Sequence, residues 1–329
     1  MKVHFARTRS PLAHSCVPTM IEMLANQRDR RGHVGVDDPA DADLVLFPDC
    51  HLLPRDWKLD EIATSETARR FPHKVAVYNE RDTPWCRFPG IYVSMPASHF
   101  ARRWQVAGAY YRVNDPAARL DVDAGRIEPD LLASFVGGRT HRARETILRL
   151  SDPRIHVEAP EGFVFYDPSS VRFDERRKSF AETLFRSKFV LCPRGMGTSS
   201  IRLYETLAAG RVPVVISDQW VPPTGPKWDE FCLRWPEDRI DDLPSALRDF
   251  EGEAAAMGQR ARGAYEEWFA PDVALSAVLD QLETRSKAPG FTDLPAGGIH
   301  DLQYVRAGAS RLRMQYHGLR GRARRALTS

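Results

Sequence analysis

The stretch Ser187 to Glu205 combines the residue types and the spacing that bind a phosphate-bearing ligand. It reads SKFVLCPRGMGTSSIRLYE, which predicts a buried strand, a glycine-containing loop and then a helix. The start of such a helix presents backbone N–H groups to whatever lies at the C-terminal end of the strand. Gly195 and Gly197 would let the loop backbone approach a phosphate closely. The sequence therefore predicts an anion site at this turn.

Several side chains in the same turn suit a diphosphate. Arg194 supplies a planar cation, which pairs well with phosphate oxygens. Thr198, Ser199 and Ser200 follow the loop, where they can cap the helix or donate hydroxyl groups to phosphate oxygens. We expect all four residues to contact the bound ligand.

Arg202 and Glu205 are three residues apart, so they share one face of the predicted helix. A carboxylate this far into a helix lies beyond the phosphates, at a distance where it can accept hydrogen bonds from the two hydroxyls of a ribose. An ordinary surface Arg/Glu pair explains the spacing equally well. No Lys-Ser or Lys-Thr follows the glycines, so the loop is not a P-loop, and the spacing of the dinucleotide fingerprint is absent as well.

Short apolar runs alternate with amphipathic segments, which is the pattern of parallel strands connected by helices. The pattern restarts near residue 130, so we expect two Rossmann-like, doubly wound α/β domains that face each other. The expected strands are 2–6, 42–47, 74–78, 91–94, 131–136, 155–157, 189–192 and 212–216, and the expected helices are 17–30, 58–71, 140–150, 175–186 and 199–209. The corresponding domains are 1–130 on the acceptor side, 131–285 on the nucleotide side, and a basic helical tail, 286–329, that packs back on the body.

Leu191 to Phe231 resembles the core motif of the exostosin-like glycosyltransferases, family 47. The resemblance rests on three matches in this sequence, which are CPRG at 192–195, SIRLYE at 200–205 and AGRVPVVISD at 209–218. Looser matches occur at 132–137 and at 42–48. The resemblance implies a GT-B architecture and inverting transfer from a UDP-sugar, with no obligatory divalent metal and no other cofactor. It also implies that Arg194, Ser200, Arg202 and Glu205 contact the donor.

Inverting transfer needs a base near the acceptor hydroxyl, and in a two-domain fold that base should come from the N-terminal domain across the cleft. Two acidic segments follow predicted strands there, one with Asp49 and the other with Glu80 and Asp82. We rank Glu80 and Asp82 above Asp49, because three charged residues crowd just after a buried strand. Carboxylates at strand ends are more often solvated and structural, and that alternative stays open.

Two further motifs contain residue types that bind metals or sugars. Asp121-Val122-Asp123 has the spelling of a metal-binding DxD pair, but a Gly-Arg turn follows it, and we interpret it as an exposed loop. Trp220 and Trp228 could form a wall for a sugar or base ring, or they could pack against the last helices. We predict no metal site.

Composition restricts the class of protein. The 47 basic and 44 acidic residues give a formal charge of +3, which argues against a dedicated nucleic-acid binder. Five scattered cysteines form no CxxC pair, the N-terminus has no apolar signal-peptide region, and no run of 18 apolar residues occurs. These features favour a cytoplasmic protein, peripheral at most to the inner membrane face, and thus a bacterial-type relative without the membrane anchor common among animal and plant members.

The tail has a different composition from the body. From Leu302 to Ser329 there are seven arginines, no lysine and no acidic residue. A helix that packs back on the body with a solvated basic face would explain this composition, and so would contact with an anionic surface or polymer.

These observations predict an inverting glycosyltransferase that moves a sugar from a nucleotide-sugar, with a UDP-sugar expected, to a hydroxyl of a glycan or glycoconjugate. Two alternatives stay open among related functions: a noncatalytic nucleotide- or sugar-binding protein, and a glycosyltransferase that acts on a nucleobase or small metabolite. A third is a nucleic-acid or envelope-associated binding module that uses the basic tail.

Overall fold

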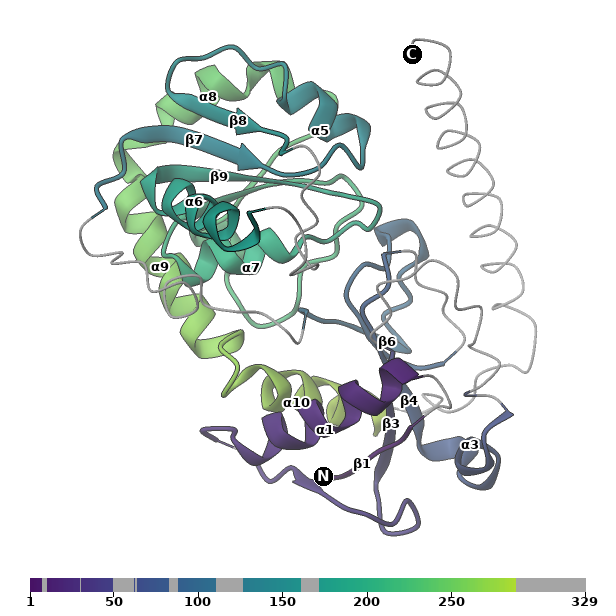
Figure 1. The fold of residues 1–329 in the computed structure, drawn as a ribbon. Helices are drawn as coiled ribbons and strands as arrows, with labels where there is room; N and C mark the ends of the chain where they lie inside the picture. Colours follow the sequence, from purple (N-terminus) through teal and green to yellow (C-terminus); the bar gives the residue numbers. More distant parts are fainter. Residues whose placement is uncertain are drawn as a thin grey trace, which may run out of the picture.

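The computed structural model describes residues 1–7, 11–29, 31–49, 62, 64–82, 88–110, 127–160 and 172–287. Within these ranges the chain forms two parallel sheets, one from each half of the sequence (Figure 1). The predicted tail from 288 onward and the Asp121–Asp123 motif lie outside the described residues. None of the described helices is both long enough and apolar enough to cross a bilayer.

The N-terminal sheet has six parallel strands in the order β2-β1-β3-β4-β5-β6. Runs such as Leu44–Phe47 and Val75–Tyr78 are apolar throughout and buried, as expected for strands covered on both faces. The strands are β1 (Lys2–Phe5), β2 (Val34–Gly35), β3 (Leu44–Asp49), β4 (Val75–Asn79), β5 (Gly90–Tyr92) and β6 (Gln105–Ala107). Its described helices are α1 (Pro11–Ala25) and α3 (Glu66–Arg70).

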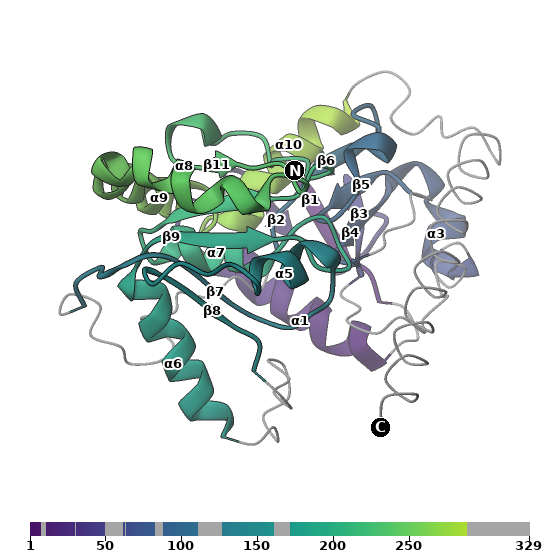
Figure 2. The same ribbon diagram turned by 90° about the horizontal axis from the view of Figure 1, so that it is seen from above.

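The C-terminal sheet has five parallel strands in the order β11-β10-β9-β7-β8, with β9 at its centre. These strands are β7 (Leu131–Val136), β8 (Ile155–Glu158), β9 (Ser187–Pro193), β10 (Val212–Ile216) and β11 (Leu233–Arg234). The helices of this half are α5 (Arg142–Ile147), α6 (Phe173–Arg186), α7 (Ile201–Ala208), α8 (Leu243–Asp249) and α9 (Ala254–Trp268). In the view from above, α6 extends away from the body of the domain (Figure 2). The α/β fold with two parallel sheets agrees with the prediction.

The last described helix, α10 (Ala274–Ser286), does not belong to the C-terminal half. It lies beside α1, and four of its residues enter the core of the N-terminal sheet together with Val3 and Met20 (Figure 1). These four are Leu275, Val278, Leu279 and Leu282. The predicted domain boundary at 285 is therefore too late, because burial of this apolar face on the first sheet draws the chain back after α9.

Candidate functional site

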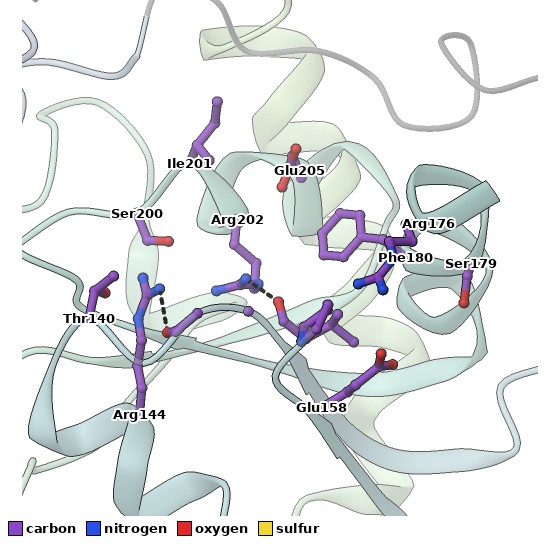
Figure 3. Close-up of a pocket in the computed structure, with 14 residues that line it drawn as sticks. Thr140, Arg144, Glu158, Arg176, Ser179, Phe180, Ser200, Ile201, Arg202 and Glu205 are labelled. Carbon is purple, nitrogen blue, oxygen red and sulfur yellow. Dashed lines mark hydrogen bonds between the residues drawn. The ribbon is translucent and has the colours of Figure 1, made fainter. Parts of the chain in front are cut away.

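A cavity of about 350 Å³ lies at the C-terminal ends of β7 and β8, between α6 and the start of α7 (Figure 3). This is the edge of a parallel α/β sheet at which ligands bind. One end has Thr140, Arg144 and Ser200, and the other end has Glu158, Arg176 and Phe180, with Arg202 and Glu205 between them. Its remaining lining residues are Val136, Gly137, Gly138, Pro160, Ser179 and Ile201.

Arg202 and Glu205 both belong to the wall of this cavity, as their shared helix face predicted. They are buried, with 9% and 5% of their surface exposed, so they are not an ordinary surface pair. The guanidinium of Arg202 lies 4.8 Å from the centre of the Phe135 ring, and its Nη2 donates to the carbonyl of Val136. This packing fixes Arg202 at the centre of the cavity. Ser200 is the N-cap residue of α7, and its side chain makes no capping hydrogen bond.

Arg144 was not singled out from the sequence, although it lines the cavity. Its Nε donates to the carbonyl of Arg194 at 2.9 Å and its Nη1 to that of Gly138 at 3.3 Å. It thus connects the two glycine-containing loops that follow β7 and β9. The sequence did contain a signal for this residue, since a basic helix follows directly after the strand that ends at Gly137-Gly138. A cation at that position lies at the same edge of the sheet as the loop after β9.

Arg194 does not line the cavity, and its predicted contact with the diphosphate stays a prediction. It faces the N-terminal domain, where its charge acts on Asp82. Its side chain is 18% exposed, and its Nη2 donates to the carbonyl of Met196 at 3.4 Å. Its Nε is buried with no hydrogen-bond partner among the described residues. A buried N–H of this kind is costly unless a ligand oxygen satisfies it.

The loop after β9 lies in contact with the N-terminal domain. Gly195 packs under Arg144 and Thr140, and a Cβ on Gly197 would lie 2.7 Å from both Asp82 Oδ1 and Ser94 Oγ. Only a residue without a side chain fits between these groups.

The next two residues also contact the N-terminal domain, and for Thr198 this contact replaces the predicted one with phosphate, whereas a phosphate contact of the Ser199 hydroxyl stays a prediction. Thr198 donates its hydroxyl to the carbonyl of Ser94 at 3.0 Å, so its single donor is not available to phosphate. The carbonyl of Ser199 accepts from the hydroxyl of Tyr110 at 3.4 Å, and neither residue lines the cavity. Ser200 is the one member of the predicted hydroxyl trio that does.

Asp82 is a carboxylate of the N-terminal domain that lies against this loop. It stays open to solvent, but the surrounding protein atoms raise its pKa from the usual value, against the opposing effects of Arg144, a hydrogen bond from the Gly197 N–H, and Arg194. A raised pKa suits a general base, because proton affinity increases with it. Glu80 is half-buried and close enough to raise the pKa of Tyr110 and Tyr204.

The third predicted carboxylate, Asp49, ends β3, where its Cα pairs in register with Asn79. Its side chain lies outside the described part of the structure. The backbone places it at the same sheet edge as Glu80 and Asp82.

Trp220 and Trp228 belong to the core. Their rings meet edge to face with centroids 5.1 Å apart, and both pack in one cluster with Phe231 and Phe269. Trp228 donates its Nε1–H to the carbonyl of Pro223 at 2.8 Å. They therefore do not form a wall for a ligand.

Among the described residues, one group has ligand atoms close enough together to hold a metal ion, His33, Asp280 and Glu283. Arg31 pairs with Asp280 and Lys287 with Glu283, both at distances below 3 Å. This cluster is better explained as an ion network that fastens α10 to the N-terminal domain, since its carboxylates already have cations.

Comparison with known proteins gives a match between residues 80–250 and the exostosin GT47 domain. The chain is 28% identical over 194 residues to Exostosin-1 of Drosophila melanogaster, a match that covers 55% of this chain and 25% of that protein. It is 29% identical over 124 residues to a probable glycosyltransferase of Arabidopsis thaliana, which covers 36% of this chain and 21% of that protein. The chain thus spans about a quarter or less of the length of these curated relatives.

Solved structures with a similar arrangement include an α1,3-fucosyltransferase, with 11% identity, a TM-score of 0.40, and coverage of 89% of this chain and 91% of that one. A second is WaaG, a glycosyltransferase involved in lipopolysaccharide biosynthesis, with 10% identity, a TM-score of 0.36, and coverage of 91% and 100%.

Proposed function

The chain belongs to the exostosin GT47 family of glycosyltransferases and has its GT-B fold of two parallel α/β domains, and from this premise we propose that it transfers a sugar from a UDP-sugar to a hydroxyl group of a glycan or glycoconjugate, with inversion at the anomeric carbon. The observation that carries the proposal is the position of Asp82. This carboxylate lies against the same loop, after β9, that leads into the buried Arg202 and Glu205 of the cavity.

The cavity suggests how a donor would lie. The diphosphate fits at the start of α7, where helix N–H groups, Ser200 and Arg144 meet. Glu205 is then one nucleoside length away and accepts hydrogen bonds from the ribose hydroxyls. The nucleobase extends toward Phe180 and Glu158, at the far end of the cavity.

The transfer step needs one base and a stabilised leaving group. The acceptor oxygen attacks the anomeric carbon, its proton passes to Asp82, and the bond from the anomeric carbon to the phosphate oxygen breaks with its electron pair leaving on UDP. Arg144 lines the cavity and hydrogen-bonds the loop that carries Arg194, so we place both guanidinium groups against the negative charge that develops on the diphosphate. This arrangement supports transfer without a divalent metal.

Nucleotide binding tests the donor assignment. Thermal unfolding with UDP, GDP, ADP and their sugars should show stabilisation by UDP and UDP-sugars, about 2.7 kcal/mol at one hundred times the dissociation constant. NMR of the product's anomeric proton, with glycan acceptors present, then reports inversion. A chain that no activated sugar stabilises would rule out the proposal.

Base variants separate an enzyme from a noncatalytic binder. Asp82→Asn should lose turnover and keep UDP affinity. The variants Glu80→Gln and Asp49→Asn test the two alternative residues for the role of catalytic base. If turnover survives in the Asp82 variant and fails in one of the others, the base assignment moves to that residue. If no turnover of any UDP-sugar is measured in the unmodified protein, the binding role replaces the enzymatic one.

A further inference from the structure

Glu237 is a buried carboxylate that the proposed mechanism does not use. It follows β11, and only 6% of its side chain is exposed. Its Oε1 accepts a hydrogen bond from the Asp218 N–H at 3.1 Å, and Asp218 Oδ1 accepts one from the Glu237 N–H at 3.1 Å. This reciprocal pair of hydrogen bonds fixes the loop after β10 to the loop after β11. The carboxylate of Glu237 then faces Arg194 and His141.

Two groups face that carboxylate. Arg194 Nη1 lies 3.8 Å from Oε1, and His141 Nε2 lies 4.0 Å from Oε2. His141 Nδ1 accepts a hydrogen bond from the Ala143 N–H at 3.3 Å, which places the ring proton on Nε2. Burial, with Arg194, Arg142 and Arg144 nearby, lowers the pKa of His141 to about 4, so the ring is neutral at pH 7. The charged partner of Glu237 is therefore Arg194.

Arg194 lies between two carboxylates. Glu237 is on its own domain, and Asp82 is across the cleft, close enough for the Arg194 charge to oppose the rise in the Asp82 pKa. The other groups that act on Asp82 are Arg144 and the Gly197 N–H, and Tyr110 lies near enough for the Asp82 charge to raise the Tyr110 pKa. Without Glu237 as a counter-ion behind it, Arg194 would turn toward Asp82, because a carboxylate attracts a guanidinium that has lost its own partner.

We infer that Glu237 is a positioning residue, which holds Arg194 back from Asp82 and keeps the buried Arg194 N–H directed at the leaving diphosphate. This inference rests on the proposed function. It gives Glu237 two effects, since it keeps the base free to take a proton and keeps a cation on the leaving group. Both effects pass through Arg194.

The first experiment compares Glu237→Gln with Asp218→Asn in UDP-sugar turnover. Both substitutions remove one charge from the same hydrogen-bonded pair and keep an oxygen acceptor, but Asp218 has no ion pair with Arg194 among the described residues. We expect kcat/KM to fall about tenfold in Glu237→Gln, and the acid limb of its pH profile to move to lower pH. Asp218→Asn should leave that limb in place. An equal shift in both variants would overturn the inference.

A double-mutant cycle tests the path of the effect. If Glu237 acts through Arg194, Glu237→Gln should change kcat/KM little in an Arg194→Ala background. Effects that multiply independently would show that Glu237 acts elsewhere and would overturn the inference.

A second readout needs no turnover, so it separates this inference from the proposed function. Phenylglyoxal modifies accessible arginines, and peptide mass spectrometry measures the rate at Arg194. Loss of the Glu237 carboxylate should turn Arg194 out of its buried position toward the exposed Asp82 and increase that rate several-fold in Glu237→Gln relative to Asp218→Asn. An unchanged rate refutes the positioning role even if the enzyme is active, whereas a faster rate in a protein that turns over no nucleotide-sugar refutes only the proposed function.

Discussion

Gly197→Ala should uncouple nucleotide binding from turnover. The new Cβ would lie 2.7 Å from Asp82 Oδ1 and from Ser94 Oγ, and 3.0 Å from the Asp82 Cα. Ordinary contacts of a Cβ begin near 3.4 Å, so the groups must separate by about 0.7 Å. Ser94 is fully buried and cannot turn aside freely. The methyl group therefore pushes the carboxylate away from the loop after β9.

The displacement sets the size of the effect. A misplacement of about 1 Å can cost a factor of about 100 in rate, so we expect kcat to fall between about tenfold and a hundredfold. Overpacking should also cost about 1–3 kcal/mol of unfolding free energy. UDP affinity should change little, because the three atoms nearest to the new methyl group belong to Asp82 and Ser94 and not to the lining of the donor cavity.

The assay compares this variant with Gly138→Ala, a matched change at the rim of the same cavity. There the nearest atom to the new Cβ is the Thr140 methyl carbon at 3.9 Å, an ordinary contact. Steady-state turnover, UDP titration calorimetry and thermal unfolding are measured on both variants. Full turnover in Gly197→Ala, or an equal loss of turnover in Gly138→Ala, would refute the close approach of Asp82 as a requirement for activity.

Four further outcomes follow from the site. The raised pKa of Asp82 places the acid limb of the pH–rate profile above the usual aspartate range. Asp82→Asn should abolish turnover at every pH of the series. Glu205→Gln should weaken UDP binding about tenfold or more by calorimetry but 2′-deoxy-UDP much less, because one ribose hydrogen bond is already missing there. The pKa of His141 is about 4 in the folded protein against 6.5 for a free histidine, so between these values the unfolded chain binds one more proton than the folded one. The unfolding free energy therefore decreases as the pH falls from 6.5 to 4. His141→Asn should remove up to about 3 kcal/mol of that decrease in denaturant titrations. Turnover should be unchanged after dialysis against EDTA, and a loss restored by Mg²⁺ or Mn²⁺ would refute metal-independent transfer.

The sequence was informative where strands are apolar throughout. The runs at 44–47, 75–78, 189–192 and 212–216 all lie inside strands, because a run without polar residues can only be buried. The short edge strands β2 and β11 were not predicted. Each has two residues and few buried side chains, so neither leaves a hydrophobic pattern to detect.

The sequence predicted which residues of the candidate site share one helix face, but not which residues they contact from distant parts of the chain. Helix periodicity placed Arg202 and Glu205 on one face, a local relation that the structure reproduces. The roles of Thr198 and Arg194 depend on Ser94, Asp82 and Glu237, which are far away in sequence. Spacing within one segment contains no information about such partners, so only the tertiary packing of the folded chain could show them.

The return of α10 has a consequence for how the protein is made. The described strands of the first sheet have all been synthesised once residue 107 is added, yet residues 275–282 contribute to its apolar core. During the synthesis of the intervening chain that surface stays open to chaperones and to premature association. Expression of residues 1–130 alone should accordingly yield aggregates, and co-expression of the α10 segment as a separate peptide is the direct way to rescue their solubility.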